Sequence, residues 1–166
     1  MKEETEGYLL DTNHCAYILN AKGKPEDKQS QLEKNTIQAI SSRIDTVLHI
    51  SEATLGELIY GVEYSKHKEA NLQELKALTE VVPPLLIDQE VWQWFGKAKA
   101  QLRIVGKKIP DIDLLIASTA KRYHLILVTN DKHLALLDSL PEPFVKRENW
   151  AQPENVREFT TKVKGG

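Results

Sequence analysis

With 166 residues, 41% of them hydrophobic, the chain is long enough to bury one core and too short for two ordinary domains. Its formal net charge of −2 gives no overall attraction to nucleic acid, so such a contact would need a local basic patch. The single cysteine excludes an internal disulfide. The acidic start without a signal-peptide core and the lack of any apolar run near 18 residues predict a cytoplasmic protein with no membrane segment.

Short apolar runs alternate with helical patterns through the first half of the chain. The polar stretch 20–34 contains Gly23, Pro25 and many charges, which predicts a mobile connection. Ser51 stands where it can cap the helix that contains Glu57. In chain order we expect a strand at 8–10, a helix through 16–19, a helix carrying Ile37, Ile40 and Ile44, a strand at 46–50 and a helix carrying Leu55, Leu58, Ile59 and Val62.

The second half of the chain continues this alternation. Gly106 is expected to end a helix, because glycine readily adopts the left-handed conformation that often follows the last helical turn. Pro110 fixes the entry of the next helix, which leads into the most strand-like segment of the chain. In order we expect a helix at 68–79, a strand at 85–87, helices at 91–105 and 114–123, a strand at 125–129 and a last short strand at 144–146.

Strands separated by helices predict an α/β fold with three layers, in which helices cover both faces of a central, mostly parallel sheet. We assign residues 7–148 to this one domain and residues 149–166 to a polar C-terminal tail. In such sheets, ligands bind beyond the carboxyl ends of the strands. Asp11 and Asp131 each follow a predicted strand directly, so we expect both at that edge of the sheet.

Four acidic residues stand beside apolar runs and have no Lys or Arg three or four positions away. On a helix surface a base at that spacing usually offsets an acid, so these four suggest that another cation supplies the charge. Each acid also has a simple explanation when taken singly. Asp11 and Asp113 stand before helices and could be caps, Asp131 could be a turn residue, and Glu57 could be a solvated surface residue.

Convergence of four such acids at one edge of a sheet favours a metal site over four separate explanations. Carboxylates that share a crevice repel one another, and a divalent ion removes that repulsion. Oxygen ligands favour Mg²⁺ or Mn²⁺ over zinc, since the five histidines lack the spacing of a zinc site. A bound Mg²⁺ activates water and neutralises charge on a phosphodiester, so the sequence predicts nucleic-acid hydrolysis.

Several neighbouring residues have roles that the sequence leaves open. Asp111 competes with Asp113 as a ligand, a helix cap or an acid behind the ligands. His14 can approach the nearest acid, although a surface position is the commoner outcome for such a residue. Thr129 and Asn130 can each hydrogen-bond a neighbouring carboxylate or a metal-bound water.

Other interpretations keep a similar fold without nuclease activity. A receiver-like phosphoacceptor would pair acids after its first strand, where Thr12 and Asn13 stand here. A haloacid-dehalogenase-type phosphatase would place its paired aspartates after an apolar strand, whereas Asp111 and Asp113 follow a proline. A binding module that does not cut remains the main alternative, and DNA remains open as the substrate of a nuclease.

The acids lie in four short motifs: Leu10-Asp11-Thr12-Asn13, Glu57-Leu58-Ile59-Tyr60-Gly61, Asp113-Leu114-Leu115-Ile116-Ala117 and Leu127-Val128-Thr129-Asn130-Asp131. Together they resemble the PIN-domain ribonucleases, and more narrowly the VapC-type toxins of bacterial toxin–antitoxin pairs. The match spans about residues 8–145 and keeps the family order. The resemblance implies a PIN-like fold, Mg²⁺ or Mn²⁺, endonucleolytic cleavage of RNA, a cognate antitoxin and, for many members, a homodimer.

The same resemblance assigns roles to individual residues. It implies that all four acids are catalytic and bind the metal, with Asp131 the least uniform position in the family. The stretch 20–34 is long for this family, and Asp111 is an additional acid. The supporting polar residues that it implies are Thr12, Asn13 and Thr129.

A local basic patch could guide RNA phosphates toward the acids despite the acidic total. Lys107 and Lys108 stand just before the helix that carries Asp113, and further basic residues lie on the helix before them. A solvated helix face explains these residues equally well. The other members of the candidate patch are Lys97, Lys99 and Arg103.

Overall fold

The computed structural model describes residues 7–43 and 45–153. Within those residues, one sheet contains five strands in the order β3-β2-β1-β4-β5, and every pair of neighbours is parallel. The prediction of a mostly parallel sheet is therefore confirmed. The strands are β1 (Tyr8–Leu10), β2 (Leu48–Ser51), β3 (Pro84–Leu85), β4 (Ile126–Val128) and β5 (Arg147–Glu148).

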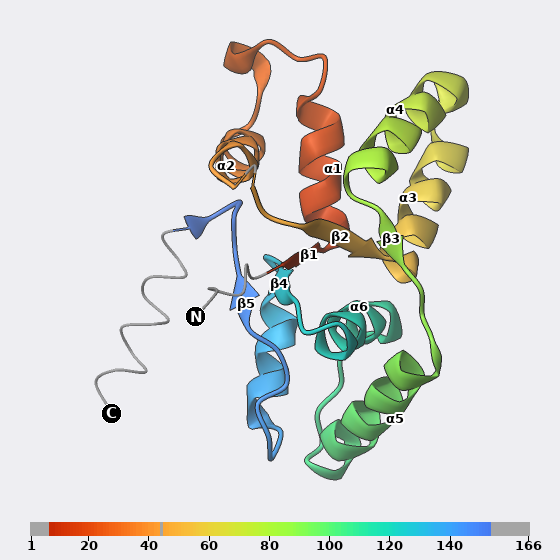
Figure 1. Ribbon diagram of the computed structural model, residues 1–166, viewed down its shortest axis with the longest axis vertical. Coiled ribbons are helices and arrows are strands. Elements are labelled where there is room, and N and C mark those ends of the chain that lie inside the picture. The colour runs from red at the N-terminus through yellow and green to blue at the C-terminus, as the bar shows by residue number, and fades with distance from the viewer. Residues whose placement is uncertain (1–6, 44, 154–166) are drawn as a thin grey trace.

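Helices cover both faces of this sheet. In Figure 1, α1 to α4 lie on one side of the sheet, and α5, α6 and η2 lie on the other, which gives the predicted three layers. The α-helices are α1 (Thr12–Ala21), α2 (Gln31–Ser41), α3 (Glu52–Tyr64), α4 (Lys68–Val81), α5 (Gln89–Ile104) and α6 (Asp111–Arg122), and the 3₁₀ helices are η1 (Glu26–Lys28) and η2 (Lys132–Ser139).

The middle strand, β1, and its neighbour β4 supply side chains to a separate core on each face. Successive residues of a strand point to opposite faces, so Leu9 and Leu127 pack in the core with α5, α6 and η2. Leu10 and Val128 pack in the other core, with α1, α3 and α4. All four side chains are fully buried. Because both faces are covered, these strands are apolar throughout rather than alternating.

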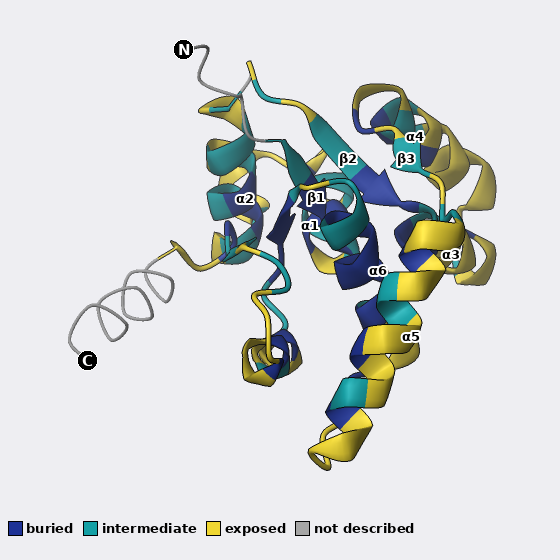
Figure 2. Ribbon diagram, turned by 60° about the horizontal axis from the view of Figure 1, so that its bottom comes forward, coloured by how far each residue is buried: buried dark blue, intermediate teal, exposed yellow. Residues whose placement is uncertain are grey.

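Helix α6 contains more buried residues than any other helix within the described residues. Seven consecutive residues from Leu114 to Ala120 are buried, and Figure 2 shows the helix as mostly dark, while α5 exposes its outer side. The hydroxyl groups of Ser51, at the end of β2, and Thr119 form a buried hydrogen bond of 2.9 Å. This contact fixes α6 against the sheet and thereby fixes the position of its first turn.

The stretch 20–34 is more regular than the predicted mobile connection. It contains the end of α1, η1 and the first turn of α2. Gln29 donates from its amide to the carbonyl oxygens of Ala21 and Lys24, and Ser30 and Glu33 form a reciprocal capping box at the start of α2. Its polar side chains are therefore used to build turns and a helix start.

The ends of some elements differ from the predictions. Helix α5 stops at Ile104, and Gly106 follows in the left-handed conformation with φ of +71°, as predicted. The last strand is at Arg147–Glu148 instead of 144–146. Helix α2 ends at Ser41, and Ile44 lies outside the described residues, as does the 154–166 part of the predicted tail.

None of the helices within 7–43 and 45–153 combines the length and the apolar content needed to cross a bilayer.

The feature of the fold that matters for function is the strand order. The chain leaves β1 toward β2 on one side, and β4 is added on the other side of β1. In parallel sheets, a crevice opens beyond the carboxyl ends of strands at such a reversal of order.

Candidate metal centre

Asp11 follows β1 directly and lies at the reversal point between β1 and β4. Its Oδ1 accepts a hydrogen bond of 2.8 Å from the backbone N–H of His14, so Asp11 caps helix α1. The explanation of Asp11 as a helix cap is therefore correct, but capping uses only one of its two carboxylate oxygens. Its Oδ2 forms no hydrogen bond with the described residues, and that leaves one oxygen for another partner.

Asp131 is placed in a similar way after β4. Its Oδ1 accepts a 2.9 Å hydrogen bond from the backbone N–H of His133, which caps η2, and also contacts His133 Nδ1 at 2.9 Å. The backbone N–H of Asp131 donates to Thr129 Oγ1 at 3.1 Å. Thr129 thus fixes the turn that carries Asp131, and one carboxylate oxygen of Asp131 again remains for the crevice.

Glu57 reaches the same region from α3. Glu57 is exposed, as expected for a solvated surface residue. Its side chain is nevertheless held in place, because the hydroxyl of Thr12 donates a short hydrogen bond to Glu57 Oε1. Thr12 begins α1, next to Asp11. A side chain from the first strand-to-helix junction therefore orients an acid from a different helix.

Asp113 lies in the first turn of α6 and does not cap it. The cap position is Pro110, with no side-chain hydrogen bond, so the capping explanation of Asp113 is wrong. The competing acid, Asp111, is exposed and pairs with Lys99 Nζ at 2.9 Å. Proline at the start of the helix leaves the carboxylate of Asp113 without the backbone partner that a cap would have.

All four predicted acids line a single hollow of about 100 Å³. They approach it from the ends of β1 and β4, from α3 and from the first turn of α6. Its lining also contains two apolar residues and no Lys or Arg. The complete lining is Asp11, Thr12, Asn13, Glu57, Asp113, Ile116, Thr129, Asp131 and Leu134.

Asn130 is the one predicted supporting residue outside that lining. Its Oδ1 accepts a 3.1 Å hydrogen bond from Asn13 Nδ2, and its own Nδ2 donates to Tyr17 Oη at 2.8 Å. These bonds connect helix α1 to the turn after β4. Asn130 therefore supports the wall of the hollow and does not face into it.

The hollow carries an uncompensated negative charge. Burial and the nearby carboxylates of Asp131, Glu57 and Asp11, in decreasing order of effect, raise the pKa of Asp113 to about 6. An ordinary aspartate has a pKa of about 4. Three other acids thus bear on Asp113 electrostatically, and this is the physical sign that the four form one site.

The residues of this hollow suit a hydrated divalent ion. Across 7–43 and 45–153, no group of three or more His, Cys, Asp or Glu side chains is arranged so that it could hold a metal ion by itself. The carboxylates instead surround a hollow with room for about three waters. Mg²⁺ keeps several of its waters and binds proteins through a few carboxylates, so an open ring of acids fits its chemistry.

His14 does not take the surface position that is the commoner outcome for such a residue, and makes instead the approach to Asp11 that the sequence left open. The side chain is fully buried, and its Nδ1 lies 2.8 Å from Asp11 Oδ1. Histidine burial depends on packing from distant segments, so the sequence alone gave only the short separation of the two residues. The one sequence signal for this contact was that His14 is a polar residue three positions after an aspartate that caps a helix.

Lys107 and Lys108 lie in the connection between α5 and α6, just before the helix that carries Asp113. Both are exposed and form no ion pair with the described residues. Other members of the candidate patch have local contacts: Lys99 pairs with Asp111, and Lys97 lies over Trp94. Arg103 is also exposed and forms no ion pair with the described residues, so it stays in the candidate patch with Lys107 and Lys108.

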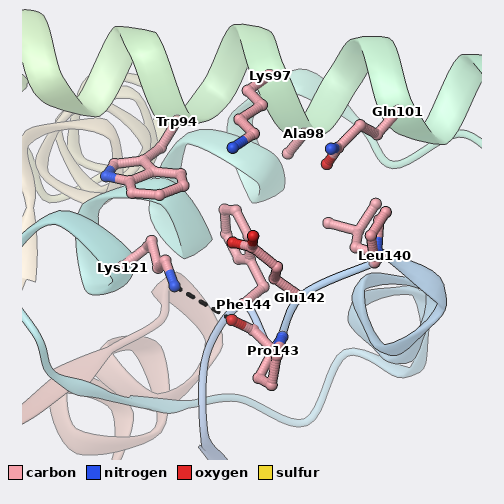
Figure 3. A pocket seen from close by; sticks show the side chains of 10 residues that line it. Trp94, Lys97, Ala98, Gln101, Lys121, Leu140, Glu142, Pro143 and Phe144 are labelled. Atoms are coloured by element: carbon pink, nitrogen blue, oxygen red, sulfur yellow. Dashed lines mark hydrogen bonds between the residues drawn. The ribbon is translucent and has the colours of Figure 1, made fainter.

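A second hollow lies between α5 and the segment after η2 (Figure 3). Lys121 donates to the carbonyl oxygen of Pro143 at 3.1 Å and lies 4.9 Å from the centre of the Trp94 ring. Trp94 in turn packs edge-on against Phe144. These contacts hold the segment against the two helices, and only one acid, Glu142, lines the hollow, so it resembles a packed joint rather than a metal site.

Comparisons with known proteins agree with this architecture. The family model described as PIN domain matches residues 8–140. The chain is 35% identical over 127 residues to Ribonuclease VapC2 of Rickettsia felis, covering 75% of this chain and 86% of that protein. It is 31% identical over 124 residues to the tRNA(fMet)-specific endonuclease VapC of Shigella flexneri, with the same coverage.

Solved structures give the same result for the fold. A chain of the DNA-bound VapBC crystal structure from Salmonella typhimurium superposes with a TM-score of 0.70 at 28% identity, covering 87% of this chain and 98% of that one. Nearly the whole of that chain is matched, so the three layers and the parallel sheet are common to both.

Proposed function

Since the chain belongs to the PIN domain family, we propose that its acidic hollow is the centre of a metal-dependent endoribonuclease that hydrolyses RNA phosphodiester bonds. The single observation that carries this proposal is the gathering of Asp11, Glu57, Asp113 and Asp131 around one hollow without a basic residue. A site with that charge attracts a divalent cation, and a cation there attracts phosphate.

Mg²⁺ or Mn²⁺, when bound, supplies activation of water and neutralisation of the charge on the phosphodiester. Asp11, Asp113 and Asp131 hold the ion through their carboxylate oxygens in this proposal, and Glu57 completes the ring from α3. Thr12 keeps Glu57 in position through its hydrogen bond, and Thr129 keeps the turn of Asp131. Asp113, whose pKa is raised to about 6, would hold the ion only in its ionised form, so binding of the ion would compete with protonation of this carboxylate.

The proposed substrate and partners follow the relatives. A similar protein is named a tRNA(fMet)-specific endonuclease, so initiator tRNA is the first substrate to test. The solved VapBC relatives support a toxin whose partner is a cognate antitoxin protein. The cytoplasmic location that the sequence predicts and the homodimer that the family resemblance implies are part of this proposal.

Incubation of the purified chain with labelled tRNA(fMet), and with DNA of the same sequence, tests the proposal. We expect cleavage of the RNA with Mn²⁺ or Mg²⁺ and none with EDTA, because the ring of acids cannot neutralise a phosphate without a cation. A gel of end-labelled substrate measures both. Cleavage in EDTA would contradict the metal requirement, and preferential cleavage of the DNA would contradict the assignment to RNA.

The alternative is a PIN-like module that binds nucleic acid or protein without cutting. It would leave the RNA intact with Mn²⁺, with Mg²⁺ and with EDTA. The raised pKa of Asp113 argues against this alternative, since a module without chemistry gains nothing from gathering four repelling acids.

Replacing Lys107 and Lys108 together by Ala tests whether they guide RNA. We expect RNA affinity to fall several-fold and its salt dependence to weaken by a slope of about 2, because each phosphate contact releases about one counterion. Binding is measured by filter retention from 50 to 200 mM salt. Lys28→Ala, an exposed lysine in η1, is the control. Unchanged affinity and slope would remove the two lysines from the substrate path.

A further inference from the structure

His14 makes an unusual contact with the proposed metal site, on which the following argument rests. Its side chain is fully buried, although histidine is often partly exposed. Asp11 Oδ1 is within 2.8 Å of both the backbone nitrogen and the ring Nδ1 of His14. The backbone contact alone would cap the helix, so the ring contact is additional.

The identity of the donor follows from the chemistry of the pair. An ionised carboxylate can only accept hydrogen bonds, so Nδ1 carries the hydrogen that lies between His14 and Asp11. The other ring nitrogen, Nε2, is buried and has no hydrogen-bond partner. With the hydrogen on Nδ1, the ring makes the one hydrogen bond that its surroundings offer.

The ring is fixed by its surroundings as well as by the aspartate. Tyr17 packs against it edge-on, with ring centres 5.7 Å apart, and Tyr17 Oη accepts from Asn130 in the wall of the hollow. His14 therefore cannot swing away without disturbing the helix start. Two donors on Oδ1 fix the rotation of the Asp11 carboxylate and leave Oδ2 as the only free oxygen.

We propose that His14 is a positioning residue that holds Asp11 so that Oδ2 alone serves the ion. Asp11 then binds with one oxygen in a preset direction, and no free energy is spent on ordering it when the ion arrives. Groups behind metal ligands commonly change metal affinity or activity by about 10- to 100-fold. His14 is expected to act in this way without touching substrate or ion.

Three variants of His14 separate this role from simple packing. The amide nitrogen of Asn occupies the position of Nδ1, so His14→Asn keeps the donor to Asp11. His14→Gln places its amide near the position of Nε2 and loses that donor, and His14→Leu fills the space without any donor. Mn²⁺ binding to the RNA-free protein, measured by the electron paramagnetic resonance of free Mn²⁺, is the first readout, and kcat and KM on tRNA(fMet) are the second.

We expect His14→Gln and His14→Leu to bind Mn²⁺ about tenfold more weakly and to lose kcat with little change in KM, while His14→Asn stays within about threefold of the parent. Equal Mn²⁺ affinity in the parent and all three folded variants would overturn this inference and leave the proposed function standing. A parent that neither binds Mn²⁺ nor cleaves RNA would overturn the proposed function, and this inference with it.

The parent protein provides a check that needs no variant to fold. Long-range ¹H–¹⁵N spectra report which ring nitrogen of a histidine carries hydrogen. For His14 we expect hydrogen on Nδ1 and a change in the Nδ1 shift on addition of Mg²⁺. A ring whose Nδ1 carries no hydrogen, or whose signals ignore Mg²⁺ that binds, would overturn the positioning role.

Discussion

Asp113→Asn is expected to leave the protein folded and to lower RNA cleavage at least about 100-fold. The amide keeps the shape of the carboxylate, so α6 and its buried residues are undisturbed. It removes one of the charges that would hold the ion, and the ion is what neutralises charge on the phosphodiester. Loss of a contribution that stabilises charge in the transition state costs about 100- to 1,000-fold. Single-turnover cleavage of tRNA(fMet) with Mn²⁺ measures the loss.

The same substitution is expected to stabilise the metal-free protein at pH 8 by about 1 kcal/mol, because it removes repulsion that solvent already screens in part. Urea unfolding in EDTA measures that change. Asp111→Asn is the matched control: it is two residues away, exposed and paired with Lys99 outside the hollow, so activity should stay within about twofold. Full Mn²⁺-dependent cleavage by Asp113→Asn would remove Asp113 from the site.

Cleavage and metal-free stability are expected to change in opposite directions as the pH falls through 6. The pKa of Asp113 is raised to about 6 in the folded protein and is about 4 when unfolded. The folded state therefore holds this proton more tightly. The stability that comes from this group is fully present below about pH 4 and is lost as the pH rises through about 6.

Cleavage follows the competition between proton and metal for this carboxylate. At Mn²⁺ concentrations below saturation, the rate should fall by up to about tenfold for each pH unit below 6. Raising Mn²⁺ tenfold should move the midpoint to lower pH, because the ion displaces the proton. A midpoint that does not move with Mn²⁺, measured from pH 4.5 to 8, would show that the proton and the ion do not compete.

The central part of the fold could be predicted because short-range pattern and long-range packing agree there. Residues 8–10 and 126–128 are apolar without interruption and form the middle strand, β1, and its neighbour β4. The edge strand at Arg147–Glu148 is short and polar. This strand forms because the path of the chain brings its backbone beside β4, and its side chains show no pattern that would predict the pairing.

The candidate site was also predictable only in part from the sequence. The sequence singled out four acids by their lack of basic neighbours, and the structure gathers them around one hollow. The sequence favoured Asp113 but left Asp111 open as a competing ligand, since that choice depends on the direction in which the first turn of α6 faces. The sequence could not anticipate that His14 is buried against Asp11, because neighbours distant in sequence enclose that ring.

The parallel arrangement of β1 and β4 has a consequence for synthesis of the chain on the ribosome. Asn13 and Asn130, which hydrogen-bond across the junction of these strands, are 117 positions apart in sequence. Contacts of such long range form late, because a large loop must close first. A nascent chain therefore lacks half of the proposed acidic ring until Asp131 has been added, and a product that stops before Asp113 carries only Asp11 and Glu57.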